Sequence, residues 1–388
     1  MTPTAWRAWP GWVQALAVYA GARLVGFLVL ERTARFQVAN PWTDADPAYL
    51  EFAGIWDGDW YRRIAEQGYP LPLPLDETGA PRQSEWAFYP AYPFLVRAVM
   101  TVLGTSWTVT APVVSLLLGA AAVVVVHRLF ARQAGERAAL GGVVLVSFFP
   151  TAVVLQLAYT ESLALLALAT SLHLLVTRRY LWAVPAVVLL GFSRAVALPF
   201  AVVVAVHLLV RWRNRATDPF GARERGQVVV LGAVAVAAGV AWPAIVGLAT
   251  GRPTAYTDVQ GAWRGGDTQF LVPWWSMAQY LLGSWVGPVA LVLLVTATVW
   301  GLTGARARAA GPELQAWCLA YLAYLVAVVD PFTSLFRFLL LLFPVGLMVA
   351  AGVRTRGHLL TWLLAMVSLQ VVWVAWLWRF TPPSDYPP

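Results

Sequence analysis

Two aspartates, Asp57 and Asp59, lie between tryptophans in the segment WDGDWY, which begins at Trp56. A partly buried carboxylate can act as a general base, because burial raises its proton affinity. Asp57 directly follows a tryptophan in a connector predicted to pack on a membrane, so it is a candidate base. Asp59 is the better candidate for an N-cap of the helix predicted at WYRRIAEQ. A D-x-D string alone is weak support for a metal site, and no His or Cys stands beside it.

Four more ionisable residues lie in or at the ends of apolar segments. They are Glu161, Arg194, Asp330 and Arg337. Each ionisable residue costs roughly 2.5–3.5 kcal/mol to insert into a membrane helix, so these positions are informative. One interpretation is that Glu161 and Arg194 simply pair, because buried opposite charges neutralise each other. Four histidines, in contrast, fall near predicted cytoplasmic helix ends, where a structural role is expected: His127, His173, His207 and His358.

The elements that must position these residues are membrane helices. The chain is 60% hydrophobic and 12% charged, and runs such as VVSLLLGAAAVVVVHRLF recur along nearly its whole length. A bilayer core about 30 Å thick needs roughly 20 apolar residues per helical span. Continuous apolar runs of this length favour helices over a barrel. The composition therefore predicts an all-α polytopic membrane protein.

The charge pattern excludes nucleic acid as a partner. The formal net charge is +8, but all 27 basic residues are Arg and they fall in small clusters between apolar segments. This is the positive-inside pattern of membrane proteins. The first apolar run is as long as a span and has no A-x-A-like site, so we expect no cleaved signal peptide. Cys318 is the single cysteine and cannot form an intramolecular disulfide.

About eleven spans are predicted. They cover residues 11–31, 108–127, 139–157, 159–177, 180–193, 195–211, 227–249, 286–304, 314–329, 333–352 and 358–379. The pair 180–193 and 195–211 could instead be one bent helix. Keeping the two apart puts every Arg cluster on one side, which is cytoplasmic if the N-terminus is. These clusters lie at 128–137, 178–179, 211–225, 306–308 and 354–356.

The same assignment places two long connectors outside the cytoplasm, at 32–107 and 250–285. Both are rich in Trp, Tyr, Pro and Gly, and they carry further acidic residues: Glu85, Asp258 and Asp267. Connectors this long are more often functional than decorative, and aromatic residues favour the membrane–water boundary. Within the first connector, YRRIAEQGY and PFLVRAVMTVLG predict short helices that lie in the interface.

Four sequence motifs resemble one enzyme family. WDGDWYRRIAEQGYP followed by EWAFYPAYPFLVR resembles the W-D-x-x-x-[FY]-x-x-I-A-x-x-G-Y and F-[FY]-P-x-[FY]-P stretches of the PIG-V family, which includes the second mannosyltransferase of GPI-anchor synthesis and bacterial relatives. SFFPTAVVLQLAYTESLALLALA is similar to its N-P-x-x-x-F-x-x-x-Y-[ST]-E-[SA]-L segment, with Phe149 where Asn is common. GFSRAVAL is similar to the A-x-x-[TS]-R-[SP]-N-G block, with Ala195 and Val196 departing from it. SLFRFLLLLFPV is similar to a final [SP]-R-[YF]-x-x-x-x-[FP]-P pattern.

The resemblance covers residues from about 50 to 345. It implies a GT-C-type fold, a single transmembrane domain over 1–388, and a multi-pass protein of the bacterial plasma membrane with an extracytoplasmic active site in the 32–107 connector. It also implies transfer of mannose from polyprenyl-phosphate-mannose to a lipid, glycolipid or secreted-protein acceptor. Asp57 matches the family's loop aspartate and would be the base of an inverting displacement, whereas Asp59 occupies a variable position.

The remaining site residues follow from this chemistry. Arg194 or Arg337 would neutralise the departing lipid phosphate, because a guanidinium presents two parallel donors and keeps its charge. Aromatic side chains suit the C–H face of a hexose, although they also anchor headgroups. The predicted substrate-binding residues are Trp56, Asp59, Trp86, Tyr89, Tyr159 and Glu161. No cofactor or metal is predicted; a divalent cation shared by Asp57 and Asp59 with Glu85 or Glu161 is the alternative.

Three other functions compete with this interpretation. A lipid or sugar transporter or flippase is expected to show repeated halves and charges near the middle of the bilayer. No repeat is evident, and the polar residues favour one side. An accessory subunit without activity is a second alternative. A transferase using polyprenyl-phosphate arabinose or glucose is the third, because the sequence does not specify the donor sugar or the acceptor.

Overall fold

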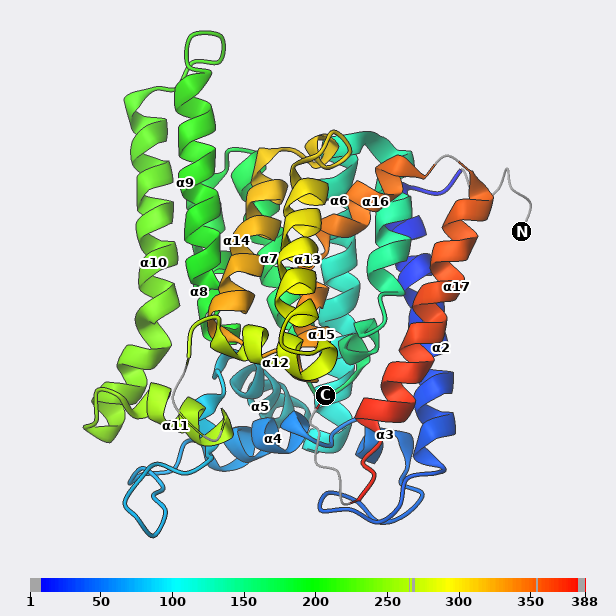
Figure 1. Cartoon of the computed structure of the whole chain (residues 1–388), viewed down its shortest axis with the longest axis vertical. Coiled ribbons are helices and arrows are strands. Elements are labelled where there is room, and N and C mark those ends of the chain that lie inside the picture. The colour runs from blue at the N-terminus through cyan, green and yellow to red at the C-terminus, as the bar shows by residue number, and fades with distance from the viewer. Residues whose placement is uncertain (1–7, 265, 267–268, 354, 383–387) are drawn as a thin grey trace.

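The computed structural model describes residues 8–264, 266, 269–353, 355–382 and 388. Asp267 and Arg354, both noted above, lie outside them. The described residues form helices joined by connectors; they contain no named strand, only an isolated bridge between Leu75 and Pro81. Long helices run side by side, and short helices lie across one end of the bundle (Figure 1). The predicted all-α membrane fold is confirmed.

The long helices form the body of the bundle. They are α2 Gly11–Ala34, α6 Trp107–Ser147, α7 Glu161–Val176, α8 Tyr180–Ser193, α9 Ala197–Arg213, α10 Ala222–Thr250, α13 Val286–Thr303, α14 Pro312–Val328, α16 Pro344–Gly352 and α17 Arg356–Trp373. Among the described residues, five helical segments are long and apolar enough to span a membrane, or six if the bent pair at 335–342 and 344–352 is one span. The predicted count of eleven therefore stays a prediction.

The shorter helices join the long ones. They are α3 Tyr49–Phe52, α4 Asp57–Gln67, α5 Ala91–Leu103, α11 Ala255–Arg264, α12 Val272–Leu282 and α15 Leu335–Phe338, with 3-10 turns at Glu85–Ala87, Ala152–Gln156, Ala307–Ala310 and Leu339–Leu342 and a π-helical turn at Val374–Trp378. Helices α4 and α5 confirm the two helices predicted in the first connector. Helices α11 and α12 lie in the second connector and were not predicted.

Helix α6 consists of two helical arms that meet at Gly135, where the chain reverses direction. Gly135 has φ 79° and ψ 166°, a conformation that glycine adopts without steric cost. The second arm packs back against the first. Gly142 of the second arm lies so close to Phe130 of the first that a Cβ on it would be 2.7 Å from the Phe130 ring. The span predicted at 139–157 is wrong at its end, since the helix stops at Ser147 and a 3-10 turn follows.

Helices α8 and α9 form an antiparallel hairpin, which confirms the prediction of two helices and not one bent helix. Helix α8 ends at Ser193, and α9 begins at Ala197. The hydroxyl of Tyr180, the first residue of α8, lies 3.1 Å from Nε2 of His207 in the last three turns of α9. A single bent helix would hold these two side chains far apart. Arg194 is therefore located in a tight turn between two helices.

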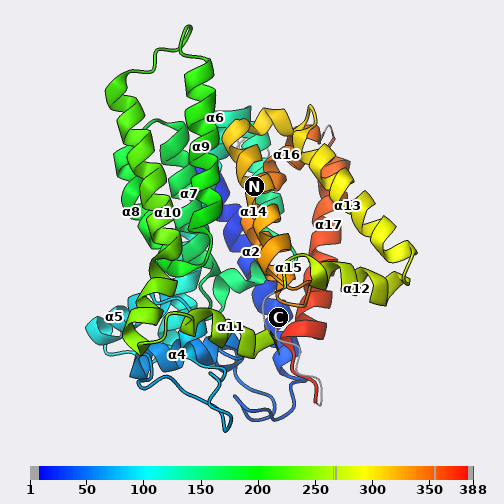
Figure 2. The same cartoon turned by 60° about the vertical axis from the view of Figure 1, so that its left-hand side comes forward.

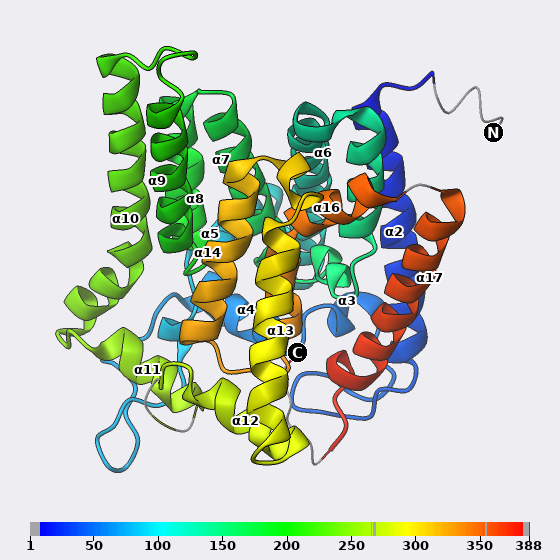
Figure 3. The same cartoon turned by 45° about the horizontal axis from the view of Figure 1, so that its top comes forward.

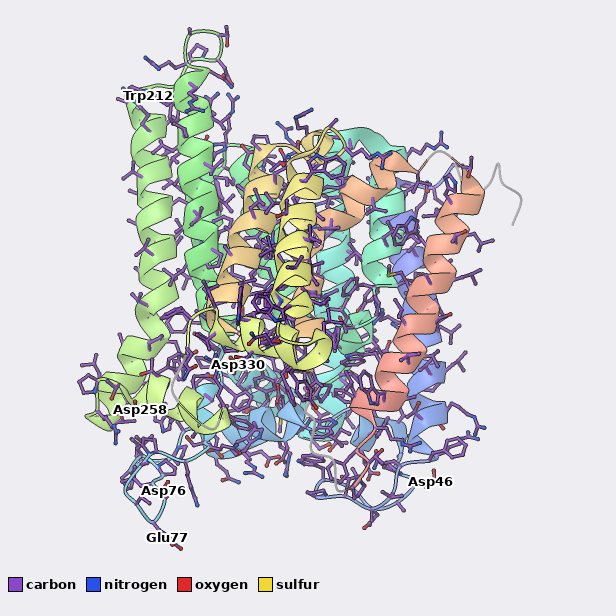
Figure 4. All side chains as sticks on the ribbon, viewed as in Figure 1. Asp46, Asp76, Glu77, Trp212, Asp258 and Asp330 are labelled. Atoms are coloured by element: carbon purple, nitrogen blue, oxygen red, sulfur yellow. The ribbon has the colours of Figure 1, made fainter. Side chains whose placement is uncertain are left out.

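The two ends of the bundle differ in their connectors. One end, here called the Arg-rich end, carries the α9–α10 and α13–α14 connectors. The opposite end, here called the loop end, carries both long connectors, with α4, α5 and α11 lying across it (Figures 1 and 2). Figure 4 shows Trp212 at the Arg-rich end and Asp46, Asp76 and Asp258 at the loop end. The α9–α10 and α13–α14 connectors therefore lie at the end opposite both long connectors; which end is cytoplasmic stays a prediction.

Candidate active site

Four charged side chains from distant parts of the chain meet near the loop end. Arg337 donates a hydrogen bond from Nη2 to Oδ2 of Asp57. Its Nη1 lies 3.2 Å from Oε1 of Glu161, and the same oxygen accepts from Nη1 of Arg194 at 2.6 Å. The predicted pairing of Glu161 with Arg194 is confirmed, but it is part of a larger group. These four residues are called the charge cluster below.

The charge cluster is almost completely removed from solvent. Side-chain exposure is 0% for Glu161, 6% for Arg337, and 13% for both Asp57 and Arg194. Two carboxylates and two guanidiniums give a formal charge of zero, which offsets the cost of burying each ion. Removal of any one member would leave an uncompensated buried charge.

Both carboxylates are placed by helix N-termini. Asp57 is the first residue of α4, and Glu161 is the first residue of α7. The positive end of the helix dipole stabilises a carboxylate in the first turn. Trp56 fixes the start of α4 with a φ of 61°, which is unusual for a bulky residue. Its indole Nε1 donates to the carbonyl of Trp378 at 2.7 Å, so distant tertiary packing holds this conformation.

Aromatic rings support the two guanidiniums. The guanidinium carbons of Arg194 and Arg337 lie 4.5 and 5.1 Å from the ring centre of Phe338. Arg337 also lies 5.1 Å from the ring centre of Tyr159. Cations are attracted to aromatic faces, most strongly where water is excluded. The Tyr159 hydroxyl accepts a hydrogen bond from the Asp57 amide at 3.1 Å. Tyr159 therefore contacts both the acidic and the basic side of the charge cluster.

The charge cluster retains unused hydrogen-bonding capacity. Among the described residues, neither Oε2 of Glu161 nor Nε of Arg337 has a hydrogen-bond partner. Buried polar atoms are normally paired, so unpaired ones need an explanation. Here an acceptor and a donor are both available for a ligand that carries hydroxyl or phosphate groups.

Three of the aromatic residues predicted to bind the sugar, Trp56, Trp86 and Tyr89, do not form one group. Trp56 packs with its ring centre 4.7 Å from Trp42. Trp86 stacks on Tyr69 at 4.6 Å. Tyr89 is in the same hydrophobic cluster as Trp86. All three are less than 10% exposed, at 4%, 4% and 8%. Their contact with a sugar stays a prediction.

Asp59 does not cap helix α4, so that interpretation is wrong. The N-cap residue is Trp56, and no side chain caps the helix. Asp59 instead pairs along the helix with Arg62 at 2.5 Å and Arg63 at 2.7 Å. The hydrogen bond to Asp59 raises the pKa of Arg62. Asp59 and Arg62 line a polar cleft of about 360 Å³ beside Trp107.

Arg23 is a functional candidate that the sequence analysis missed. It is buried in α2, and donates to the carbonyl of Ser147 at 2.7 Å and to that of Ala152. The segment it holds continues directly into Tyr159 and Glu161. The sequence could have identified it. Arg23 is an ionisable residue in the middle of the span predicted at 11–31, so its position is as informative as those of Glu161, Arg194 and Arg337.

The charge cluster can supply a base and fixed positive charge. No group of three or more His, Cys, Asp or Glu side chains is arranged to hold a metal within the part of the chain that the structure describes. Asp57 and Glu161 face guanidiniums. The arrangement suits a reaction in which an alcohol loses a proton and an anion departs.

Comparison with known proteins identifies the fold. No protein-family model and no curated protein matches the sequence. ArnT from Cupriavidus metallidurans, solved bound to undecaprenyl phosphate, matches with a TM-score of 0.52 and 17% identity over 92% of this chain and 62% of ArnT. The oligosaccharyltransferase of Archaeoglobus fulgidus, solved with Zn and sulfate, matches with a TM-score of 0.46 and 14% identity over 94% of this chain and 54% of that chain. The GT-C-type fold is confirmed, and the resemblance to the PIG-V family is not.

Proposed function

We propose that this chain is a membrane glycosyltransferase that moves a sugar from a polyprenyl-phosphate donor to an acceptor alcohol. The observation that carries the proposal is the meeting of Asp57 with Glu161, Arg194 and Arg337, which come from four separate motifs. ArnT, whose fold the chain shares, was solved with a polyprenyl phosphate bound. The resemblance of the motifs favours mannose as the sugar.

The reaction would be a single displacement with inversion at the sugar. The acceptor oxygen attacks the anomeric carbon while Asp57 takes the hydroxyl proton, and the bond from that carbon to the phosphate oxygen breaks. The electron pair leaves with the lipid phosphate. A guanidinium can hold that phosphate through two parallel hydrogen bonds. Arg337 and Arg194 are the cations for this role.

The pairing of Asp57 with Arg337 gives the donor a second effect. While Oδ2 of Asp57 accepts a hydrogen bond from Arg337, that oxygen is not free to take the proton of the acceptor alcohol. The donor phosphate would compete with Asp57 for Arg337, so donor binding would release the carboxylate. Arg194 would remain paired with Glu161. The base would therefore become active only after the donor is bound.

The charge distribution favours a loop end that faces away from the cytoplasm. The connectors of the Arg-rich end would then be cytoplasmic, as the positive-inside rule requires. The host membrane is proposed to be a bacterial plasma membrane, with residues 1–388 as a single domain and the 32–107 connector contributing the base. The acceptor is proposed to be a lipid or glycolipid, because α4 and α5 lie across the end where membrane lipids have access.

The same assay distinguishes this function from two alternatives, a transferase that uses another sugar and a transporter. A donor with another sugar on polyprenyl phosphate would use the same phosphate-binding groups. A transporter is disfavoured, because the charge cluster lies near one end of the bundle and not between repeated halves. Only a transferase forms a new glycosidic product.

The test is transfer of labelled mannose from polyprenyl-phosphate mannose to membrane lipid extracts by purified protein in liposomes. Asp57→Asn is expected to lose activity roughly a hundredfold or more while remaining folded. Asp258→Asn is the matched control, since Asp258 is at the loop end and its contacts among the described residues are the local ones with Arg252 and Thr254. Near wild-type transfer by Asp57→Asn would refute the proposal. Excess EDTA in the same assay tests the prediction that no metal is needed.

A further inference from the structure

A second cavity lies at the opposite end from the charge cluster. It has a volume of about 530 Å³, is open on one side, and is lined mainly by residues of α13, α14, α16 and α17. Helix α16 lies between α13 and α17 in both Figure 1 and Figure 3. In the most apolar 18-residue stretch of α13, and in that of α17 with the π-helical turn after it, only 17% of the residues are buried inside the protein. The cavity is therefore flanked by helices that mostly face lipid.

The cavity walls are mostly apolar. The two basic residues that line the cavity lie at the same end of the bundle. Leu302, Leu342 and Trp362 are among the wall residues, and the basic residues are Arg306 and His358. Helix α13 has 18 residues and is about 27 Å long, which is close to the thickness of the hydrocarbon core. Arg306 follows the end of α13 by three residues, and His358 lies in the first turn of α17 at the same end. Both side chains are thus at headgroup level.

Arg306 has no acidic partner within the described residues. Arg306 takes part in none of the ion pairs found among the described residues, and no acidic residue lines the cavity. Its aliphatic part packs on the backbone at Gly352, where a Cβ would meet Cδ of Arg306 at 3.3 Å. Arg306 therefore lines an apolar cavity as an exposed cation, without an acidic partner among the described residues.

We propose that this cavity binds one anionic glycerophospholipid from the membrane leaflet at the Arg-rich end. Its phosphate would lie beside Arg306 and His358, and its acyl chain would pack against α13 and α16. Basic pockets between membrane helices are suited to anionic headgroups. The apolar walls favour a lipid over a free phosphate ion. The bound lipid would also fill the space between two helices that contact little protein.

The test is lipid retention, measured by native mass spectrometry on protein released from nanodiscs of phosphatidylcholine and phosphatidylglycerol. The wild type is expected to retain phosphatidylglycerol preferentially. Arg306→Gln is expected to reduce that preference about fivefold, the effect of one Arg near a membrane surface. Arg308→Gln is the matched control, because Arg308 is in the same connector and does not line the cavity. Equal retention of both lipids by the wild type would overturn the proposal.

A second variant tests the cavity without altering charge. Gly301 lines it, and a Cβ there would meet no atom within 4 Å, so this position tolerates a side chain. Gly301→Leu is designed to occupy the cavity. This variant is expected to lose the retained phospholipid while its helix content and elution volume stay as in the wild type. Retention equal to the wild type in both Arg306→Gln and Gly301→Leu would refute the site. Displacement of the phospholipid by a polyprenyl phosphate would also refute it, and would assign the cavity to the donor chain.

Discussion

Two groups of interacting polar side chains lie at opposite ends of the bundle. At the Arg-rich end, Nδ1 of His207 lies 2.7 Å from Oε1 of Glu313, and the His207 ring also meets the hydroxyl of Tyr180. That hydroxyl donates to Glu224 at 2.8 Å, and Glu224 accepts from Arg211 at 3.1 Å. These five residues are called the helix-end network below. At the loop end, the charge cluster contains a similar mixture of acids and bases.

The two groups differ in how far apart along the chain their members are. In the helix-end network three contacts join neighbouring helices of the α8–α10 region, with sequence separations of 13 to 44 residues, and the His207–Glu313 contact to α14 spans 106 residues. In the charge cluster the separations are 33, 176 and 280 residues. The network ties adjacent helix ends together, whereas the charge cluster forms only when the whole bundle is assembled. We therefore expect the first to control stability and the second to control chemistry.

The largest effect on activity should come from Arg337. Arg337→Lys keeps the positive charge but lacks the planar pair of Nη groups that contacts Glu161 and Asp57 and that can bind a phosphate with two parallel donors. We expect transfer to fall roughly a hundredfold or more, with a higher KM for the donor. Initial rates at varied donor concentration measure both constants. If Arg337→Lys retained wild-type kcat and donor KM, the charge cluster would be a structural feature like the helix-end network.

Arg23 should affect activity through the residues it positions. Arg23→Met leaves the carbonyls of Ser147 and Ala152 without their donor, so the segment that leads to Tyr159 and Glu161 can shift. A displacement of about 1 Å can cost up to a hundredfold in rate. We expect kcat to fall roughly tenfold or more while the donor KM changes little.

The control for Arg23 is the conservative variant. Arg23→Lys restores one donor and the charge, so it should recover part of the lost kcat. Equal kcat in Arg23→Met and the wild type, at equal amounts of folded protein, would show that this buried arginine acts on stability alone.

The helix-end network provides the contrasting result. Glu313→Gln removes the charge from a carboxylate that is bonded to His207, and leaves at least one buried group poorly paired. Such a loss costs about 1–3 kcal/mol. We expect a lower temperature of thermal unfolding in detergent, with transfer per folded molecule unchanged. A loss of transfer as large as that of Arg337→Lys, without a change in unfolding temperature, would remove the distinction between the two ends.

Local features of the sequence predicted much of the positioning framework. The turn between α8 and α9 and the interfacial helices α4 and α5 follow from apolar spacing and the placement of Arg residues. The reversal between the two arms of α6 was also predicted, as separate spans at 108–127 and 139–157. The continuation of the helix through 128–134 was not, because that Arg-rich segment was assigned to a connector although it contains good helix formers. Helices α11 and α12 were missed because their connector has no long apolar run.

The site was predicted residue by residue but not as a geometry. The cost of intramembrane charge singled out Glu161, Arg194 and Arg337, and the motif resemblance singled out Asp57. That Arg337 contacts both carboxylates depends on packing between helices far apart in the chain. The start of α4 likewise depends on the bond from Trp56 to Trp378, 322 residues away. Local preference favoured Asp59 as the cap, and this distant contact overrides it.

Asp59→Asn is expected to have the smallest effect on transfer. It tests whether the chemistry depends on the position of Asp57 or only on negative charge in this turn. It lies two residues after Asp57 in the same first turn, yet it pairs with Arg62 and Arg63, whose side chains are 47% and 43% exposed. Asp59 itself is only 9% exposed, but both guanidiniums stay hydrated when it loses its charge, so the loss of these pairs should cost about 1 kcal/mol. Asp59→Asn should therefore leave kcat and the unfolding temperature close to the wild type, and its place in the polar cleft allows at most a modest rise in acceptor KM.

Asp57→Asn and Asp59→Asn make the same chemical change in one turn of one helix. Both remove one negative charge near the N-terminus of α4, so any general effect on that helix is common to the two variants. Only Asp57 contacts Arg337 and the charge cluster. A large fall in kcat for Asp57→Asn alone would assign the chemistry to the contact with Arg337. Equal losses in both variants would instead assign it to the charge of the loop end as a whole, and Asp57 would no longer be the base.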